Sequence, residues 1–190
     1  AIAVGLIPLL AQAPSTSRGA AFFYKVTGAA DNTSPVITAG HTGLSDNPYL
    51  APSLRSAVIA ANLNPGSTIT FDPMLNGTPI ILSLSGPDED LAATGDLDVR
   101  AALTITGNGP ANTIIRAGPT AGSGIDKIFS FNPKGALAGF NVIITGVTLE
   151  NGRNASNDNT GNGEGGAFDF DAGPSGSGAR RGGQGCRGRD

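Results

Sequence analysis

The sequence predicts an all-β fold in which short strands follow one another around stacked coils. Short runs of alternating polar and apolar residues recur every ~10–14 residues, between turns rich in Gly, Pro and Asn. The stretches between these runs are too short for helical crossovers. Aromatic residues make up only 5% of the chain and Trp is absent, whereas Gly (29) and Pro (13) are frequent. Small aliphatic residues must therefore build the core. A β-sandwich is the structural alternative, because the sequence has no strict repeat.

The composition excludes several classes of protein. The 190 residues suffice for one sizeable core or a short solenoid. Charged residues amount to 14% and the net charge is −3, which gives no basic surface for nucleic acid. The single cysteine, Cys186, excludes an internal disulfide framework and a zinc site built from cysteines.

The first residues have the pattern of a secretory signal. The apolar run AIAVGLIPLL precedes Ala11-Gln12-Ala13, which fits an A-x-A cleavage site. The run is shorter than the ~20 residues that span a membrane. We therefore interpret residues 1–18 as a signal-peptide remnant and linker, with an ordinary apolar segment or strand as the alternative.

One helix is predicted, over residues 53–64. Leu54, Ala57, Val58 and Ala61 recur at helical spacing and form one apolar stripe. Ser53 is a suitable N-cap, and Pro-Gly at 65–66 ends the helix. Because it precedes a series of strands, we expect this helix to cover the open end of the stacked coils.

The remaining elements are strands and loops. Before the helix, residues 22–27 form a predicted strand and residues 38–48 a loop that holds His41, the only histidine, which is expected to be solvated. After the helix, strands are predicted at residues 67–71, 79–84, 97–99, 103–106, 114–115, 127–131, 141–145, 146–150 and 166–170.

Several of these stretches together carry a resemblance to a known family. They are Ser53-Leu54-Arg55, AVIAANLNPG (57–66), STITF (67–71), PDEDLAATGDLDV (87–99), LTITGNGPANTII (103–115), KIFSF (127–131), VIITGVTLENG (142–152) and GEGGAF (163–168). In them the chain resembles the CSLREA-type domain, named for a Cys-Ser-Leu-Arg-Glu-Ala motif and found at the start of secreted bacterial proteins. Pro52 and Ser56 stand where that motif has Cys and Glu, so a capping-box glutamate is missing.

The resemblance implies a right-handed parallel β-helix of the pectin-lyase-like fold, with the short helix capping its N-terminal end. On this interpretation residues 19–172 form the capped β-helix fragment, which we expect to be truncated at its C-terminal end. Residues 173–190 are rich in Gly and Arg without large apolar residues, and this composition predicts a disordered tail.

Two groups of acidic residues are candidate ligands for Ca²⁺, the one cofactor that the sequence suggests. The first comprises Asp88, Glu89, Asp90, Asp96 and Asp98, and the alternative comprises Asp158 and Glu164 in the Asn-rich stretch 151–166. Neither group has the spacing of an EF-hand loop. A solvated acidic turn and a turn-rich excursion are the structural alternatives. No catalytic residues and no residues for an organic cofactor are assigned.

Three classes of function remain open. The first, which the resemblance favours, is a non-catalytic, adhesin-like protein that is exported by a bacterium to its surface or medium and contacts surface glycans or other surface components. The second is a polysaccharide lyase or glycoside hydrolase, by analogy of fold alone. Its candidate basic residues, Arg100, Arg116, Lys127 and Arg153, are scattered. The third is a carbohydrate-binding module, for which Tyr24 and Tyr49 are the only tyrosines.

Overall fold

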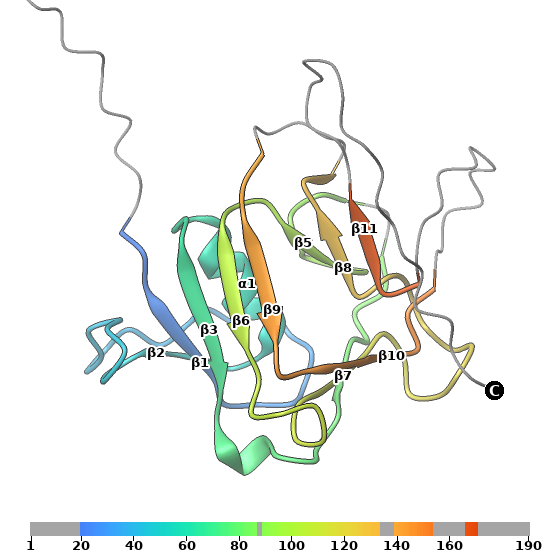
Figure 1. The fold of residues 1–190 in the computed structure, drawn as a ribbon, viewed down its shortest axis with the longest axis horizontal. Coiled ribbons are helices and arrows are strands. Elements are labelled where there is room, and N and C mark those ends of the chain that lie inside the picture. The colour runs from blue at the N-terminus through green and yellow to red at the C-terminus, as the bar shows by residue number, and fades with distance from the viewer. Residues whose placement is uncertain (1–19, 87–88, 134–138, 154–165, 171–190) are drawn as a thin grey trace, which may run out of the picture.

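Short strands with alternating burial form the framework of the computed structural model, which describes residues 20–86, 89–133, 139–153 and 166–170 (Figure 1). The strands form three sheets. The five-stranded sheet has the order β2 (Tyr49–Ala51), β1 (Phe23–Val26), β3 (Ser67–Phe71), β6 (Leu103–Thr106), β9 (Val142–Thr145). One three-stranded sheet has the order β10 (Thr148–Glu150), β7 (Ile114–Arg116), β4 (Ile80–Ile81). The other has the order β11 (Phe168–Phe170), β8 (Phe129–Phe131), β5 (Leu97–Val99).

Successive strands from β3 onward lie in different sheets. Each strand from β3 to β8 pairs with the strand three positions later in the chain. All of these pairings are parallel, and their registers place apolar residues beside one another. Ile69 pairs with Ile105, which pairs with Ile144, and Phe129 lies between Leu97 and Phe168. These rows of aliphatic and aromatic side chains supply much of the core.

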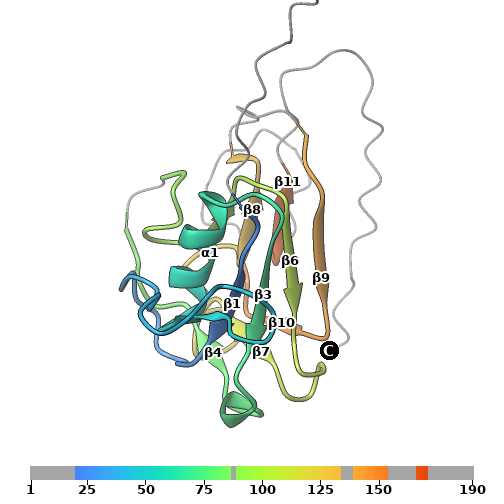
Figure 2. The same cartoon turned by 90° about the vertical axis from the view of Figure 1, so that its left-hand side faces the viewer.

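The predicted helix is confirmed as α1 (Leu54–Asn62), capped by Ser53, whose side chain accepts the N–H of Ser56. The apolar stripe of the helix is buried and belongs to the same hydrophobic cluster as the strands. The helix packs against β1, β3 and β5, and Figure 2 shows it beside the five-stranded sheet. A short 3₁₀ helix, η1 (Pro73–Leu75), follows β3.

The predicted all-β class, a right-handed parallel β-helix with a capping helix, is wrong. The fold is mixed α/β: α1 is a layer of the core, and the strands form separate small parallel sheets of strands two to five residues long. No closed solenoid is formed by the described part of the chain. The sequence misled because period-2 alternation reports where strands lie and that one face is buried, but not which element covers that face.

The positions of the strands agree with the sequence in most cases, and β2 was missed. Its three residues directly precede the helix and follow a stretch predicted as loop. The predicted signal-peptide remnant (residues 1–18) and the predicted C-terminal tail (residues 173–190) lie outside the described residues. None of the helices in the described residues has the length and apolar character that a membrane crossing requires.

A matched pair of leucine substitutions tests whether α1 is part of the core. Leu54 is 1% exposed, whereas Leu63, just after the helix, is 75% exposed. We expect Leu54→Ala to lower the free energy of unfolding by about 2–5 kcal/mol, because it leaves a cavity in the core. Leu63→Ala should change it by less than about 0.5 kcal/mol. Urea denaturation followed by circular dichroism measures both, and equal effects would contradict the layered fold.

Candidate functional site

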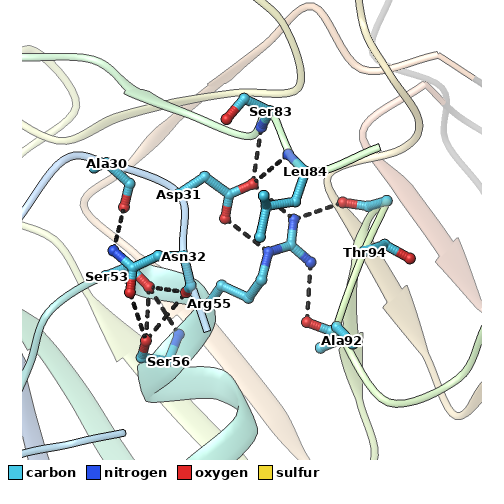
Figure 3. A network of polar contacts seen from close by, with 12 residues as sticks. Ala30, Asp31, Asn32, Ser53, Arg55, Ser56, Ser83, Leu84, Ala92 and Thr94 are labelled. Carbon is cyan, nitrogen blue, oxygen red and sulfur yellow. Dashed lines mark hydrogen bonds and ion pairs between the residues drawn. The ribbon is translucent and has the colours of Figure 1, made fainter. Parts of the chain in front are cut away.

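Arg55, in the first turn of α1, has a fully buried side chain at the centre of a network of hydrogen bonds (Figure 3). Its Nε and Nη2 donate to the two carboxylate oxygens of Asp31, at 2.7 and 3.1 Å. The remaining donors reach backbone carbonyls: Nη1 bonds Ala92 and Asp96, each at 3.0 Å, and Nη2 bonds Gly95 at 2.7 Å. All five N–H groups of the guanidinium are therefore used.

Asp31 completes this network from the other side. Its side chain is 1% exposed, and Oδ2 also accepts the backbone N–H groups of Ser83 and Leu84, at 2.8 and 2.9 Å. Burial alone would raise the pKa of Asp31, but the hydrogen bonds from Arg55, Leu84 and Ser83 together hold that pKa below its ordinary value. The pair therefore stays ionised and joins four segments: the loop at 31, the start of α1, residues 83–84 and the loop at 92–96.

The start of α1 is fixed to the same loop by hydroxyl groups. Ser53 Oγ donates to the carbonyl of Asn32 at 2.5 Å, and Ser56 Oγ donates to the same carbonyl at 3.1 Å. Ser56 stands where the resembled motif has a capping glutamate, and here its side chain binds the loop instead. The helix therefore begins with its cap and its buried arginine both attached to residues 31–32.

The side chains of Glu89 and Asp98 bind the backbone N–H groups of the loop at residues 89–96, whose carbonyls Arg55 binds. Glu89 accepts the N–H groups of Leu91, Ala93 and Thr94, at 2.7, 2.5 and 2.9 Å. Asp98 accepts the N–H of Ala92 at 2.8 Å. Ala92 has a φ of 60°, in the left-handed region that a non-glycine residue adopts at a cost of about 1 kcal/mol. The backbone N–H groups of the four successive residues 91–94 thus all donate to the carboxyl groups of Glu89 and Asp98.

Asp96 and Asp98 are buried side by side at β5, with 4% and 1% exposure. The sequence allowed them to face solvent, but both are buried, and the preceding loop lies on Asp98, whose Oδ2 accepts the Ala92 N–H. Burial, followed by the negative charges of Asp96, Glu89 and Asp90, raises the pKa of Asp98 to about 8, although the Ala92 N–H acts in the opposite direction. The Lys127 ammonium lies 3.8 Å from Asp96 Oδ2. At neutral pH Asp98 therefore carries its proton.

The calcium prediction is only partly open to inspection. Asp88, Asp158 and Glu164 lie outside the described residues. Among the residues that are described, no group of three His, Cys, Asp or Glu side chains is arranged to hold a metal ion. Glu89 and Asp98 use their oxygens on backbone N–H groups, and the structure brings them together around Ala92 as ligands of the loop itself. Calcium binding remains a prediction from the sequence.

The four basic candidates make different contacts. Arg116 Nε is 2.6 Å from Glu150 Oε2, across the neighbouring strands β7 and β10, and the pair is partly exposed. Lys127 faces Asp96, as described above. The backbone N–H of Arg100 is bound by Asn62, and that of Arg153 donates to the Asp126 carbonyl. Two of the four basic side chains, those of Arg116 and Lys127, are therefore paired with carboxylates.

The other single residues that the sequence raised also have structural partners. Tyr24 is 2% exposed in β1, and Tyr49 in β2 packs on Phe22 with ring centroids 5.1 Å apart, so neither ring forms an open platform. His41 Nδ1 lies 2.9 Å from Asn47 Oδ1 within its loop. These contacts shape the segment before α1.

The Arg55 network is the main feature that reasoning from the sequence missed. Asp31 and Arg55 are 24 residues apart, and the carbonyls that Arg55 binds lie about 40 residues further along. One signal was present: Arg55 lies next to the apolar stripe of the helix and belongs to the Ser-Leu-Arg stretch that carried the resemblance. A charged residue beside a buried stripe, followed by no acidic partner one turn later, indicates a partner elsewhere in the fold.

Comparison with models of protein families, with curated proteins and with solved structures finds no match. The resemblance to the CSLREA-type domain therefore depends only on the residues quoted for it and stays a hypothesis.

Two arginine–carboxylate pairs of similar length but different burial allow a matched test of the Arg55 network. We expect Arg55→Met to lower the free energy of unfolding by about 3–5 kcal/mol, because it leaves the Asp31 carboxylate buried without its cation. Arg116→Met breaks the partly exposed pair and should cost less than about 1 kcal/mol. Urea denaturation near neutral pH gives both values.

The effect of Arg55→Met should also depend on pH. The pKa of Asp31 is lower in the folded chain, so its contribution to stability is present above its unfolded pKa, near 3.8, and is lost as the pH falls further. An Arg55→Met effect no larger than that of Arg116→Met would show that the network is not a main source of stability.

Asp98 makes the opposite contribution. Its folded pKa, about 8, lies above its ordinary value of 3.8, so its stabilising effect is present at low pH and is lost as the pH rises toward 8. We expect stability to fall by roughly 1.4 kcal/mol per pH unit in this range, which is the slope for one proton. Asp98→Asn should flatten the slope, whereas the exposed control Asp46→Asn should keep it. Denaturation at several pH values from about 5 to about 8 measures the slope, and an unchanged slope in Asp98→Asn would contradict the assignment.

Proposed function

We propose that this chain is a non-catalytic, exported protein with a structural or adhesive role at a bacterial cell surface. The observation that carries the proposal is the way in which charged side chains at the start of α1, in the loop before it and in the loop at 89–96 are used. The five N–H groups of Arg55 and the carboxylates of Asp31 and Glu89 all bind backbone groups or each other. Groups committed in this way fix loops and are not free to bind or transform a substrate.

Export is supported by the sequence. The apolar run followed by Ala-Gln-Ala at 11–13 has the form of a signal peptide. The single cysteine is compatible with an oxidising compartment, because no pair of thiols has to be kept reduced. Contact with surface glycans or other surface components is the corresponding proposal for partners.

One observation favours a second candidate, a hydrolase that acts on polysaccharides. Asp96 and Asp98 are neighbouring carboxyl groups with different environments, and such pairs supply the acid and the base of glycoside hydrolysis. Their exposures of 4% and 1% leave a sugar ring no access to either carboxyl group. This candidate therefore requires the loop at 89–96 to open.

A pair of assays on the full chain separates the two candidates. We expect no reducing-sugar or unsaturated product from polygalacturonate, with or without added Ca²⁺, and retention of the chain on a subset of surfaces in a glycan array. Product formation that exceeds a heat-denatured control and is lost in Asp96→Asn would overturn the non-catalytic proposal. Absence of both product and glycan retention would contradict the adhesive role and leave the structural one.

A further inference from the structure

Each of the three sheets has one edge that is covered by other parts of the chain. At β2, Leu50 exchanges two backbone hydrogen bonds with Ile37, at 2.7 and 3.1 Å. Beside β5, the Asn62 side chain donates to the Asp98 carbonyl and accepts the Arg100 N–H, at 2.7 and 2.8 Å. The segment after β4 gives two backbone N–H groups to Asp31. These contacts block the addition of another strand on that side.

The outer edge of β9, at the other end of the large sheet, has no such cover in the described residues. The carbonyls of Asn141 and Thr145 accept hydrogen bonds from the chain of β6, at Leu103 and Gly107. Since backbone groups alternate in direction along a strand, the N–H and C=O of Val142 and Ile144 point away from β6. No hydrogen bond from the described residues reaches them.

The side chains of β9 suit pairing as well. The strand carries no charged residue, and the Ile143 side chain is 54% exposed on the outer face. Val142 and Ile144 pack against the core on the inner face and remain partly exposed. The usual protections of an edge strand, a lysine, a proline or a bulge, are missing from these four residues.

We propose that β9 is a docking edge for a second copy of this chain, paired antiparallel about a two-fold axis at Ile143. In this register Val142 and the partner's Ile144 exchange both of their outward hydrogen bonds, and so does the symmetric pair. Ile143 then faces its own copy in the narrow, non-hydrogen-bonded position between them. The register keeps Val142 and Ile144 on the core side of the joined sheet.

A second copy fits this edge better than a foreign strand for two reasons. The outward backbone groups of β9 are symmetric about Ile143, so the edge is complementary to itself. The absence of charge means that identical edges meet without repulsion. Because the opposite edges are covered, a copy cannot add head to tail, and the assembly closes as a dimer instead of growing into a fibre.

Light scattering after size-exclusion chromatography of the full chain tests the proposal. We expect a concentration-dependent dimer in the wild type. Ile143→Lys places like charges opposite each other in the dimer, and Ile144→Pro removes an outward N–H but leaves the hydrogen bonds to β6 intact. Each variant should therefore raise the dimer dissociation constant roughly tenfold or more. Met74→Lys, at a side chain 90% exposed in η1, is the matched control and should leave the dimer intact.

Cross-linking fixes the register and does not depend on whether the edge variants fold. In a Cys186→Ser background, Ile143→Cys should form a disulfide-linked dimer under mild oxidation, because opposed residues in the non-hydrogen-bonded position bring their Cβ atoms to about 4.5 Å, the upper end of the range for a disulfide. Met74→Cys in the same background should not. The proposal would be overturned by a wild type that stays monomeric or assembles beyond a dimer, or by a dimer that does not cross-link at position 143. Capture of an added edge-strand peptide by a monomeric chain would instead favour a foreign partner.

Discussion

The ion pair of Arg55 and Asp31 is the interaction on which much of the remaining architecture depends. Moving two charges out of water is unfavourable unless each is fully hydrogen-bonded, and here every donor of the guanidinium has an acceptor. That requirement fixes the geometry of four segments at once, because each must bring a backbone group to the pair. The helix, the loop before it and the loop at 92–96 are consequently placed together by one side chain.

The loop at 89–96 shows how a segment without secondary structure is held in place. Its donors bind carboxyl groups, its carbonyls bind an arginine, and the left-handed Ala92 between them is buried. Asp31 and Asp98 respond to protons in opposite senses, because bonding lowers one pKa and burial beside other acidic groups raises the other. Acidification below the ordinary pKa of an aspartate therefore weakens the contribution of Asp31, and a rise in pH toward 8 weakens that of Asp98.

Local sequence patterns were sufficient for most elements of the fold but not for its class. The alternation in STITF predicted β3 at its observed bounds, and the spacing of Leu54, Ala57, Val58 and Ala61 predicted α1 and its cap. Both signals come from residues close together in the chain. The layered arrangement was not predicted, since the packing of α1 against β5 depends on contacts between residues far apart in the chain.

The same limit applies to the candidate site. Asp96 and Asp98 were singled out from the sequence as an acidic group, but alternation suggested an exposed face, whereas contacts with the loop and with Lys127 go with their burial. Asp31 was not singled out, because its role arises from Arg55 on a different segment. Polar networks that close over long sequence separations leave little trace in local patterns, whereas caps, turns and amphipathic stripes are local by nature.

The parallel pairing of each strand with the strand three positions later has a consequence for how the chain acquires its structure during synthesis. Paired residues from β3 onward are separated by about 35 positions. The neighbour of a newly made strand is therefore synthesised only after the two strands that lie between them in the sequence. Until then its open side is exposed to other nascent chains. The helix is made before β3 and β5, two of the strands that it contacts, and the edge strands β4 and β5, which are made first in their sheets, are the ones whose outer side the chain covers.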